Sequence, residues 1–145
     1  MGRILVVYYS RSGNTEKAAA AVAEGAKSTG KHEVKCVAVG DLDLSEFTAA
    51  DAFAFGSPDY FSYMAGEMKT FFESALGKVE RIKGKPFVSF MTHGGGGSGI
   101  ESLDRLGSAI GLRKVTDGVA VPGAPDPHAA ETLRTLGTHL AEEVG

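Results

Sequence analysis

Hydrogen-bonding side chains are concentrated in one short stretch near the start of this 145-residue chain. The stretch consists of Ser10, Arg11, Ser12, Gly13, Asn14 and Thr15. Hydroxyl and amide groups on a glycine-containing turn, directly before a helix, form a typical anion site, because the first helical N–H groups lack partners within the helix. The spacing differs from the lysine-containing loop of nucleoside triphosphate sites and from the three-glycine pattern of dinucleotide sites. We therefore predict that this stretch binds a single phosphate group.

The elements on either side of this stretch support a phosphate site. Residues 4–9 are apolar or aromatic without alternation, which predicts a strand buried on both faces. The alanine-rich residues that follow predict a helix over about 15–29. A helix cap alone would use one side chain, Asn14 or Thr15, whereas this turn carries four hydrogen-bonding side chains. We favour the phosphate site over a simple cap.

The rest of the chain alternates between strand and helix patterns. Further strands are predicted at residues 33–39, 52–56, 86–91 and 115–121, the last of them uninterrupted. This alternation predicts a parallel sheet with right-handed crossovers. The first, third and fourth strands are nearly all apolar and therefore central, whereas Lys35 and Asp117 mark the second and fifth strands as edges. The order 2-1-3-4-5 satisfies these constraints, so we predict an α/β fold with one domain over residues 1–145.

Two further unusual loops follow the central strands. The first contains Ser57, Pro58, Asp59, Tyr60 and Phe61, and the second contains Thr92, His93, Gly94, Gly95, Gly96 and Gly97. Because ligands bind beyond the carboxyl ends of the strands where the strand order reverses, both loops should converge on the phosphate site. Aromatic side chains and an open glycine backbone suit a flat, partly apolar ring. Tyr60 is the expected stacking residue. Phe61 could equally pack under the loop, and His93 is either a donor to the ring or a solvated loop residue.

These motifs resemble those of flavodoxin-like proteins. The sequence S-R-S-G-N-T is similar to the phosphate loop of that family, and G-S-P-D-Y with the helix after it is similar to its second flavin loop. The resemblance covers essentially the whole chain and implies a flavodoxin-like three-layer sandwich that binds FMN. It implies that residues 10–15 hold the FMN phosphate and that residues 57–61 and 92–97 hold the ring. The uninterrupted fifth strand resembles that of short-chain members.

The same resemblance implies a function but leaves three alternatives open. An electron carrier between redox partner proteins, a reductase and an acceptor, is our first expectation, because the chain is short. The loop after the fourth strand lacks the usual aromatic residue, and residues 57–63 lack the glycine that helps to stabilise the one-electron-reduced ring. These two departures favour an NAD(P)H:quinone oxidoreductase, although such enzymes are usually longer. A flavin-binding protein without turnover is the third alternative, and we assign no catalytic residue.

Composition argues against several other classes of function. The net charge of -3 and the lack of a basic run argue against nucleic-acid binding. We expect no membrane span or signal peptide, since no apolar run has the required length and flanks. Cys36 is the only cysteine, which suits a reducing cytoplasm, and its strand pattern predicts a buried core position. We also expect no metal site, because His, Cys and carboxylate residues show no ligand spacing.

Overall fold

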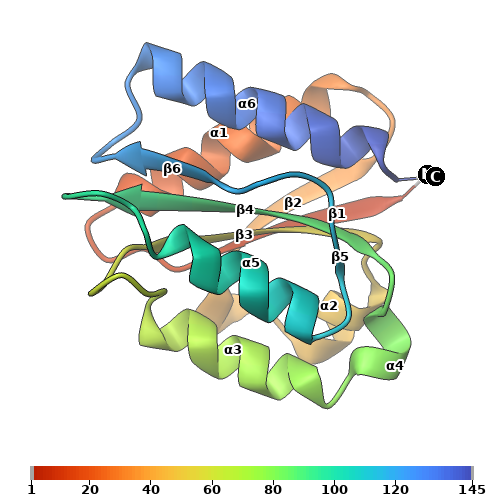
Figure 1. Cartoon of the computed structure of the whole chain (residues 1–145). Coiled ribbons are helices and arrows are strands. Elements are labelled where there is room, and N and C mark those ends of the chain that lie inside the picture. Colours follow the sequence, from red (N-terminus) through yellow and green to blue (C-terminus); the bar gives the residue numbers. More distant parts are fainter. Residues whose placement is uncertain (1, 145) are drawn as a thin grey trace.

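A parallel β-sheet lies between two layers of helices in the computed structural model, which describes residues 2–144 (Figure 1). The strands are β1 (Arg3–Tyr8), β2 (Glu33–Ala38), β3 (Ala52–Pro58), β4 (Pro86–His93), β5 (Arg113–Lys114) and β6 (Val119–Pro122). Their order is β2-β1-β3-β4-β5, β6 also pairs with β4, and every pairing is parallel. The predicted order 2-1-3-4-5 and the three-layer α/β class are therefore confirmed.

The helices cover the two faces of the sheet unequally. One face carries two long helices, α1 (Asn14–Ser28) and α6 (Pro127–Glu142), which lie side by side (Figure 1). The other face carries shorter helices, α2 (Leu44–Ala49), α3 (Gly66–Leu76), α4 (Val79–Ile82) and α5 (Ile100–Ala109), and the 3-10 turn η1 (Val39–Asp41) precedes α2. Within residues 2–144, no helix combines the length and hydrophobicity needed to cross a membrane.

The central strands are buried on both faces, as their apolar sequences predict. Residues 4–7 of β1 and 52–55 of β3 have exposed fractions of zero. Alternate residues enter two separate apolar cores, one beneath α1 and α6 and the other beneath α2, α3 and α5. The second core is rich in phenylalanine, and the ring centroids of Phe47 and Phe53 lie 4.5 Å apart. Lys35 on β2 is exposed, as expected for an edge strand.

The prediction for the fifth strand, residues 115–121, is wrong in one respect, because the strand is split into β5 and β6. These two strands pair with the two ends of β4, and the chain between them leaves the sheet. Gly118 lies against α5 in this gap. Its N–H donates to Asp104 Oδ2 at 3.3 Å, and a Cβ on Gly118 would lie 2.6 Å from Ile100 Cγ1. The bond to α5 replaces a bond of the sheet, and the close approach requires glycine.

The predicted core position of Cys36 is also wrong. Cys36 is exposed on β2, the edge strand, where alternate side chains face away from the core. Partial burial of the sulfur atom nevertheless raises the pKa of the Cys36 thiol to about 11. The thiol is therefore protonated at neutral pH, which makes it a poor nucleophile.

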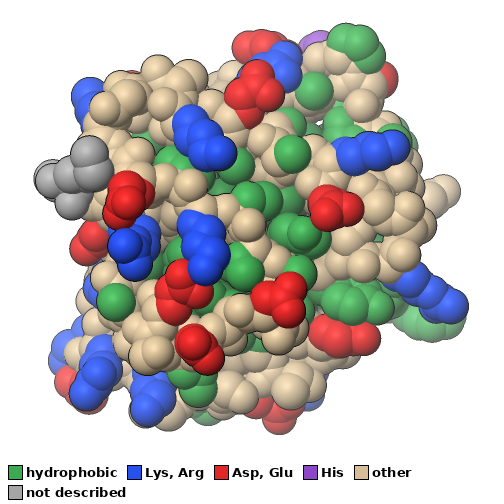
Figure 2. All heavy atoms as spheres, turned by 180° about the vertical axis from the view of Figure 1, so that it is seen from behind, with side chains coloured by type: hydrophobic (Ala, Val, Ile, Leu, Met, Phe, Trp, Pro, Cys, Tyr) green, Lys and Arg blue, Asp and Glu red, His purple; other side chains and the backbone are tan. Residues whose placement is uncertain are grey.

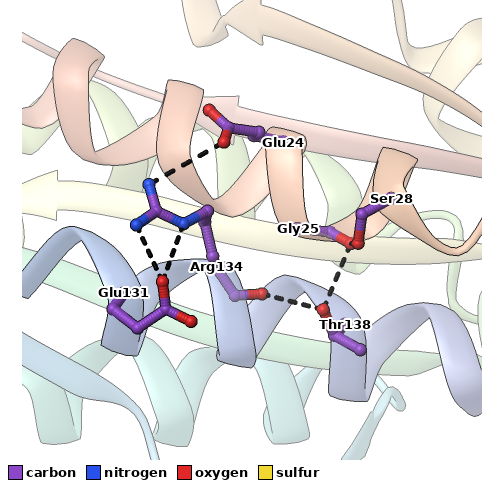
Figure 3. Close-up of polar contacts among 6 residues, drawn as sticks. All are labelled: Glu24, Gly25, Ser28, Glu131, Arg134 and Thr138. Carbon is purple, nitrogen blue, oxygen red and sulfur yellow. Dashed lines mark hydrogen bonds and ion pairs between the residues drawn. The ribbon is translucent and has the colours of Figure 1, made fainter.

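The two long helices approach closely through glycine. Gly25 on α1 faces α6, and Thr138 Oγ1 donates to the carbonyl oxygen of Gly25 at 3.2 Å and to that of Arg134 at 3.1 Å (Figure 3). Ser28 Oγ donates to the same Gly25 oxygen at 2.7 Å. On α6, Gly137 lies so close to α1 that a Cβ there would overlap the carbonyl oxygen of Val22. The close packing of α1 on α6 therefore requires glycine at positions 25 and 137.

We expect Gly137→Ala to lower the free energy of unfolding by about 1–3 kcal/mol, because overpacking outweighs the ~1 kcal/mol by which alanine favours a helix. Urea unfolding followed by circular dichroism measures the change. The matched control is Gly66→Ala in the first turn of α3, where a Cβ would have no neighbour within 4 Å. We expect the control to be neutral or stabilising. Equal effects of the two substitutions would contradict close packing of α1 on α6.

Candidate functional site

Loops that follow four strands surround a cavity of about 240 Å³ at the carboxyl edge of the sheet. The lining residues are Arg11, Ser12, Asn14, Thr15, Pro58, Asp59, Tyr60, Thr92, His93, Gly94 and Gly123. The structure therefore brings together residues from all three loops that the sequence singled out. The other predicted residues, Ser10, Gly13, Ser57, Phe61, Gly95, Gly96 and Gly97, do not line this cavity.

The predicted phosphate loop leads into α1, whose first N–H groups have no side-chain partner among the described residues. The N-cap residue of α1 is Gly13, with φ of 98°, so neither Asn14 nor Thr15 acts as the cap. Among the described residues, no side chain caps this helix. Ser10 Oγ instead accepts a hydrogen bond from Gly13 N at 3.1 Å, which closes the turn. Free N–H groups and the helix dipole together favour an anion at this position.

A buried pair of hydroxyl groups connects the first loop to the third. Thr15 Oγ1 and Thr92 Oγ1 are 2.7 Å apart, and either oxygen could be the donor. The two residues are only 1% and 3% exposed. Each hydroxyl has one donor and two acceptor positions, so this bond leaves further capacity for a ligand in the cavity. The pair fixes the start of α1 relative to the end of β4.

Ser57 holds the second loop together rather than facing the cavity. It is fully buried, and its Oγ accepts from Ala65 N at 2.8 Å while donating to Pro58 O at 2.8 Å. The next part of the loop is tied to β4, since Asp59 N donates to Thr92 O at 2.8 Å. Asp59 Oδ1 is buried and has no partner among the described residues. This oxygen lies beside Gly99, where a Cβ would be 2.6 Å from it, so it faces the start of α5.

A tight turn in the second loop gives Tyr60 and Phe61 different surroundings. Tyr60 and Tyr63 exchange two backbone hydrogen bonds, of 2.8 Å and 3.1 Å. Between them, Phe61 and Ser62 have φ of 57° and 65°, values typical of a type I′ turn. The turn places Tyr60 on the cavity wall and leaves Phe61 fully exposed, at 103% of its reference area. The structure thus favours Tyr60 over Phe61 as the aromatic wall of the cavity.

The glycine loop folds around the histidine ring. Gly96 N donates to His93 Nδ1 at 2.9 Å, which leaves the ring proton on Nε2. Gly97 is buried against the same ring, and a Cβ on Gly97 would lie 2.6 Å from His93 Cδ2. Only His93 and Gly94 of the five residues from 93 to 97 reach the cavity. Of the four glycines, only Gly97 packs on the imidazole, whereas Gly94, Gly95 and Gly96 are exposed.

Gly123 completes the cavity and was not predicted from the sequence. Its N–H donates to His93 O at 2.9 Å, and its φ is 57°. The glycine between two prolines after the last strand, in P-G-A-P, was a signal that could have identified it. Within residues 2–144, no group of three His, Cys, Asp or Glu side chains could hold a metal ion.

We expect Phe61→Gly to raise the free energy of unfolding by about 0.5–1 kcal/mol, because glycine adopts positive φ without the steric cost that a phenylalanine has. The ring is fully exposed, so its removal should cost no burial. Phe61→Ala is the control, since alanine keeps the strain and should leave stability nearly unchanged. Thermal and urea unfolding measure both variants. Destabilisation by Phe61→Gly would mean that the ring packs against the protein in solution.

Comparisons with known proteins agree with this geometry. A family model described as Flavodoxin matches residues 6–135. A flavodoxin from Aquifex aeolicus (strain VF5) is 36% identical over an alignment of 162 positions, gaps included, which covers 99% of this chain and 88% of the relative. A probable NAD(P)H dehydrogenase (quinone) from Arabidopsis thaliana is 34% identical over an alignment of 120 positions, gaps included, but the match covers only 65% of this chain and 44% of that protein.

Solved structures extend the agreement to the fold. A flavodoxin from the domain Archaea superimposes with a TM-score of 0.90 and 25% identity, covering 97% of each chain. The family model and the Aquifex relative each cover most of this sequence, and all residues that line the cavity lie within the range that the family model matches. The chain therefore belongs to the flavodoxin family of FMN-binding electron-transfer proteins.

Proposed function

We propose that this protein carries electrons between larger redox proteins and holds FMN in the cavity formed by its three loops. The observation that carries the proposal is the uncapped N-terminus of α1, with hydroxyl side chains beside it, at the meeting point of loops from β1, β3 and β4. When bound, FMN supplies a ring that accepts and returns electrons. The protein residues supply binding, orientation and a local environment.

The first loop is the proposed phosphate site. Ser12, Asn14 and Thr15 line the cavity beside the open N–H groups of α1, and a phosphate carries about -1.5 to -2 charges at neutral pH. Arg11 also lines the cavity and is exposed, so its guanidinium can offset part of that charge. Ser10 and Gly13 serve the site indirectly, since their mutual hydrogen bond shapes the turn.

The second and third loops are the proposed ring site. Tyr60 offers an aromatic face, and such stacking is worth ~0.5–1.5 kcal/mol beyond the area that it buries. Asp59 also lines the cavity, and a carboxylate can accept from a ring N–H group. His93 can donate from Nε2, because its Nδ1 accepts from Gly96. We propose that these three side chains orient the ring, with Gly94 and Gly123 allowing close approach of the backbone.

A transient carrier also needs partners and a compartment. The net charge of -3 favours weak, salt-sensitive docking to basic partners, a reductase and an acceptor. The single cysteine suits a reducing compartment, and we propose the cytoplasm.

The second candidate function is NAD(P)H:quinone oxidoreduction. The observation that favours it is the third loop, which contributes only Thr92, His93 and Gly94 to the cavity and therefore no Phe, Tyr or Trp ring. A planar substrate could stack on such an open ring face. The partial matches to quinone-type dehydrogenases fit this candidate as well.

Removing a side chain that binds the phosphate should weaken the binding of FMN but not that of riboflavin. We expect Ser12→Ala and Thr15→Val each to lower FMN affinity by about 10–100-fold, since a hydrogen bond to a charged group contributes ~1.5–3 kcal/mol. Riboflavin lacks the phosphate and should bind parent and variants alike. Quenching of flavin fluorescence measures both ligands, and Ser45→Ala on α2 is a matched control away from the cavity. Equal losses for FMN and riboflavin would contradict a phosphate site at this loop.

The two candidate functions differ in their kinetics. A carrier should accept electrons from a flavodoxin reductase at a rate that falls as salt rises, because the docking is electrostatic. It should oxidise NAD(P)H only slowly by itself. Stopped-flow absorbance of the FMN-loaded protein measures both reactions. Rapid turnover of NAD(P)H with a quinone, without any reductase, would favour the oxidoreductase instead.

A further inference from the structure

A second and larger cavity, of about 740 Å³, lies beside the proposed FMN site. It is formed by the loops after β1 and β2, the first turn of α1 and the exposed side of α3. Arg11 lines both cavities, so the two share one wall. Its volume is typical of sites for small organic ligands. The proposed FMN site does not use the rest of this cavity.

The cavity exists because the connection between β2 and β3 is short. This connection contains the three-residue η1 and the six-residue α2, whereas α1 and α6 have 15 and 16 residues. Tyr9, Leu42 and Leu44 are therefore only half-buried, and with Phe71 they form apolar walls. Figure 2 shows the molecule from the side of β2 and α2, where hydrophobic side chains reach the surface between acidic and basic ones.

The polar part of the lining is predominantly acidic. It carries three carboxylates, those of Glu16, Asp41 and Glu67, against the single guanidinium of Arg11. Among the described residues, none of these three carboxylates takes part in an ion pair. Within the lining, three negative charges therefore stand against the single positive charge of Arg11.

Two tyrosines add neutral aromatic faces to this acidic cavity. Tyr8 OH donates to Glu16 Oε2 at 3.2 Å. Burial is the main cause that raises the pKa of Tyr8, and the nearby Glu16 adds to it. Burial likewise raises the pKa of Tyr9, and Glu67 adds to it. Both tyrosine hydroxyl groups therefore stay protonated, and both side chains stay neutral, at neutral pH. Neutral aromatic faces next to carboxylates attract organic cations through the ring quadrupole and through charge.

We propose that this cavity binds a small amphipathic organic cation, an apolar group that ends in an amidinium, guanidinium or amine. The apolar part would lie against Leu42, Leu44 and Phe71, and the cation would face Asp41 and Glu67. An anionic ligand would meet three carboxylates, and a neutral apolar ligand would desolvate them without compensation. A metal ion does not fit, since no group of three ligating side chains exists within residues 2–144.

The test uses benzamidine as the cationic probe and benzamide as its neutral isostere. Amide chemical shifts and calorimetry are recorded on the FMN-loaded and FMN-free protein. We expect saturable shifts for benzamidine in residues 39–44 and 67–74, and at least tenfold weaker binding of benzamide. Raising the salt concentration to 0.5 M should weaken benzamidine binding severalfold, because the carboxylates are screened.

Substitutions of residues that line the cavity test whether benzamidine binds there. Glu67→Gln and Asp41→Asn should each weaken benzamidine about threefold or more, whereas Arg11→Gln should tighten it about twofold, because it removes the competing cation. The control is Glu142→Gln, an exposed carboxylate at the end of α6, which should leave binding unchanged. Equal binding of benzamide, shifts confined to other surfaces, or unaffected carboxylate variants would overturn the proposal. Failure to bind FMN would count only against the proposed function, since the FMN-free protein tests this cavity alone.

Discussion

Strands β1 and β3 are shielded from water on both faces, and residues 4–7 and 52–55 have no exposed surface at all. A sheet that is apolar on both sides must be covered by helices on both sides, which requires crossover connections and parallel strands. All carboxyl ends of the strands then lie at one edge. The loops after β1, β3 and β4 meet there, so the position of the cavity follows from the burial of two strands.

Within that edge, a few hydrogen bonds hold the loops in place. The Thr15–Thr92 bond of 2.7 Å joins residues 77 positions apart and is almost fully shielded from water. Asp59 N to Thr92 O and Gly123 N to His93 O add two backbone links to the end of β4. The last two residues of β4, Thr92 and His93, therefore support the other three loops. Buried hydrogen bonds of this kind favour one arrangement, because breaking them leaves unsatisfied polar atoms.

The sequence was sufficient for the strand order and for most of the cavity, because both depend on local patterns. Unbroken apolar runs identify doubly buried strands, and S-R-S-G-N-T combines a turn with a helix start. The failures come from contacts distant in sequence. Gly118 leaves the sheet because Asp104 on α5, 14 positions earlier in the chain, binds its N–H. Cys36 lies on an edge strand, where an apolar pattern no longer implies burial on both faces.

The first loop separates two sites of opposite character. On one side, the uncapped start of α1 and its hydroxyls favour an anion, and on the other side, Glu16, Asp41 and Glu67 favour a cation. Arg11 is the one cation common to both linings. A phosphate that draws the guanidinium towards the smaller cavity would leave the larger one more negative, and the phosphate charge itself would act across a short distance. Binding at one proposed site would therefore affect the other through the placement of this single side chain.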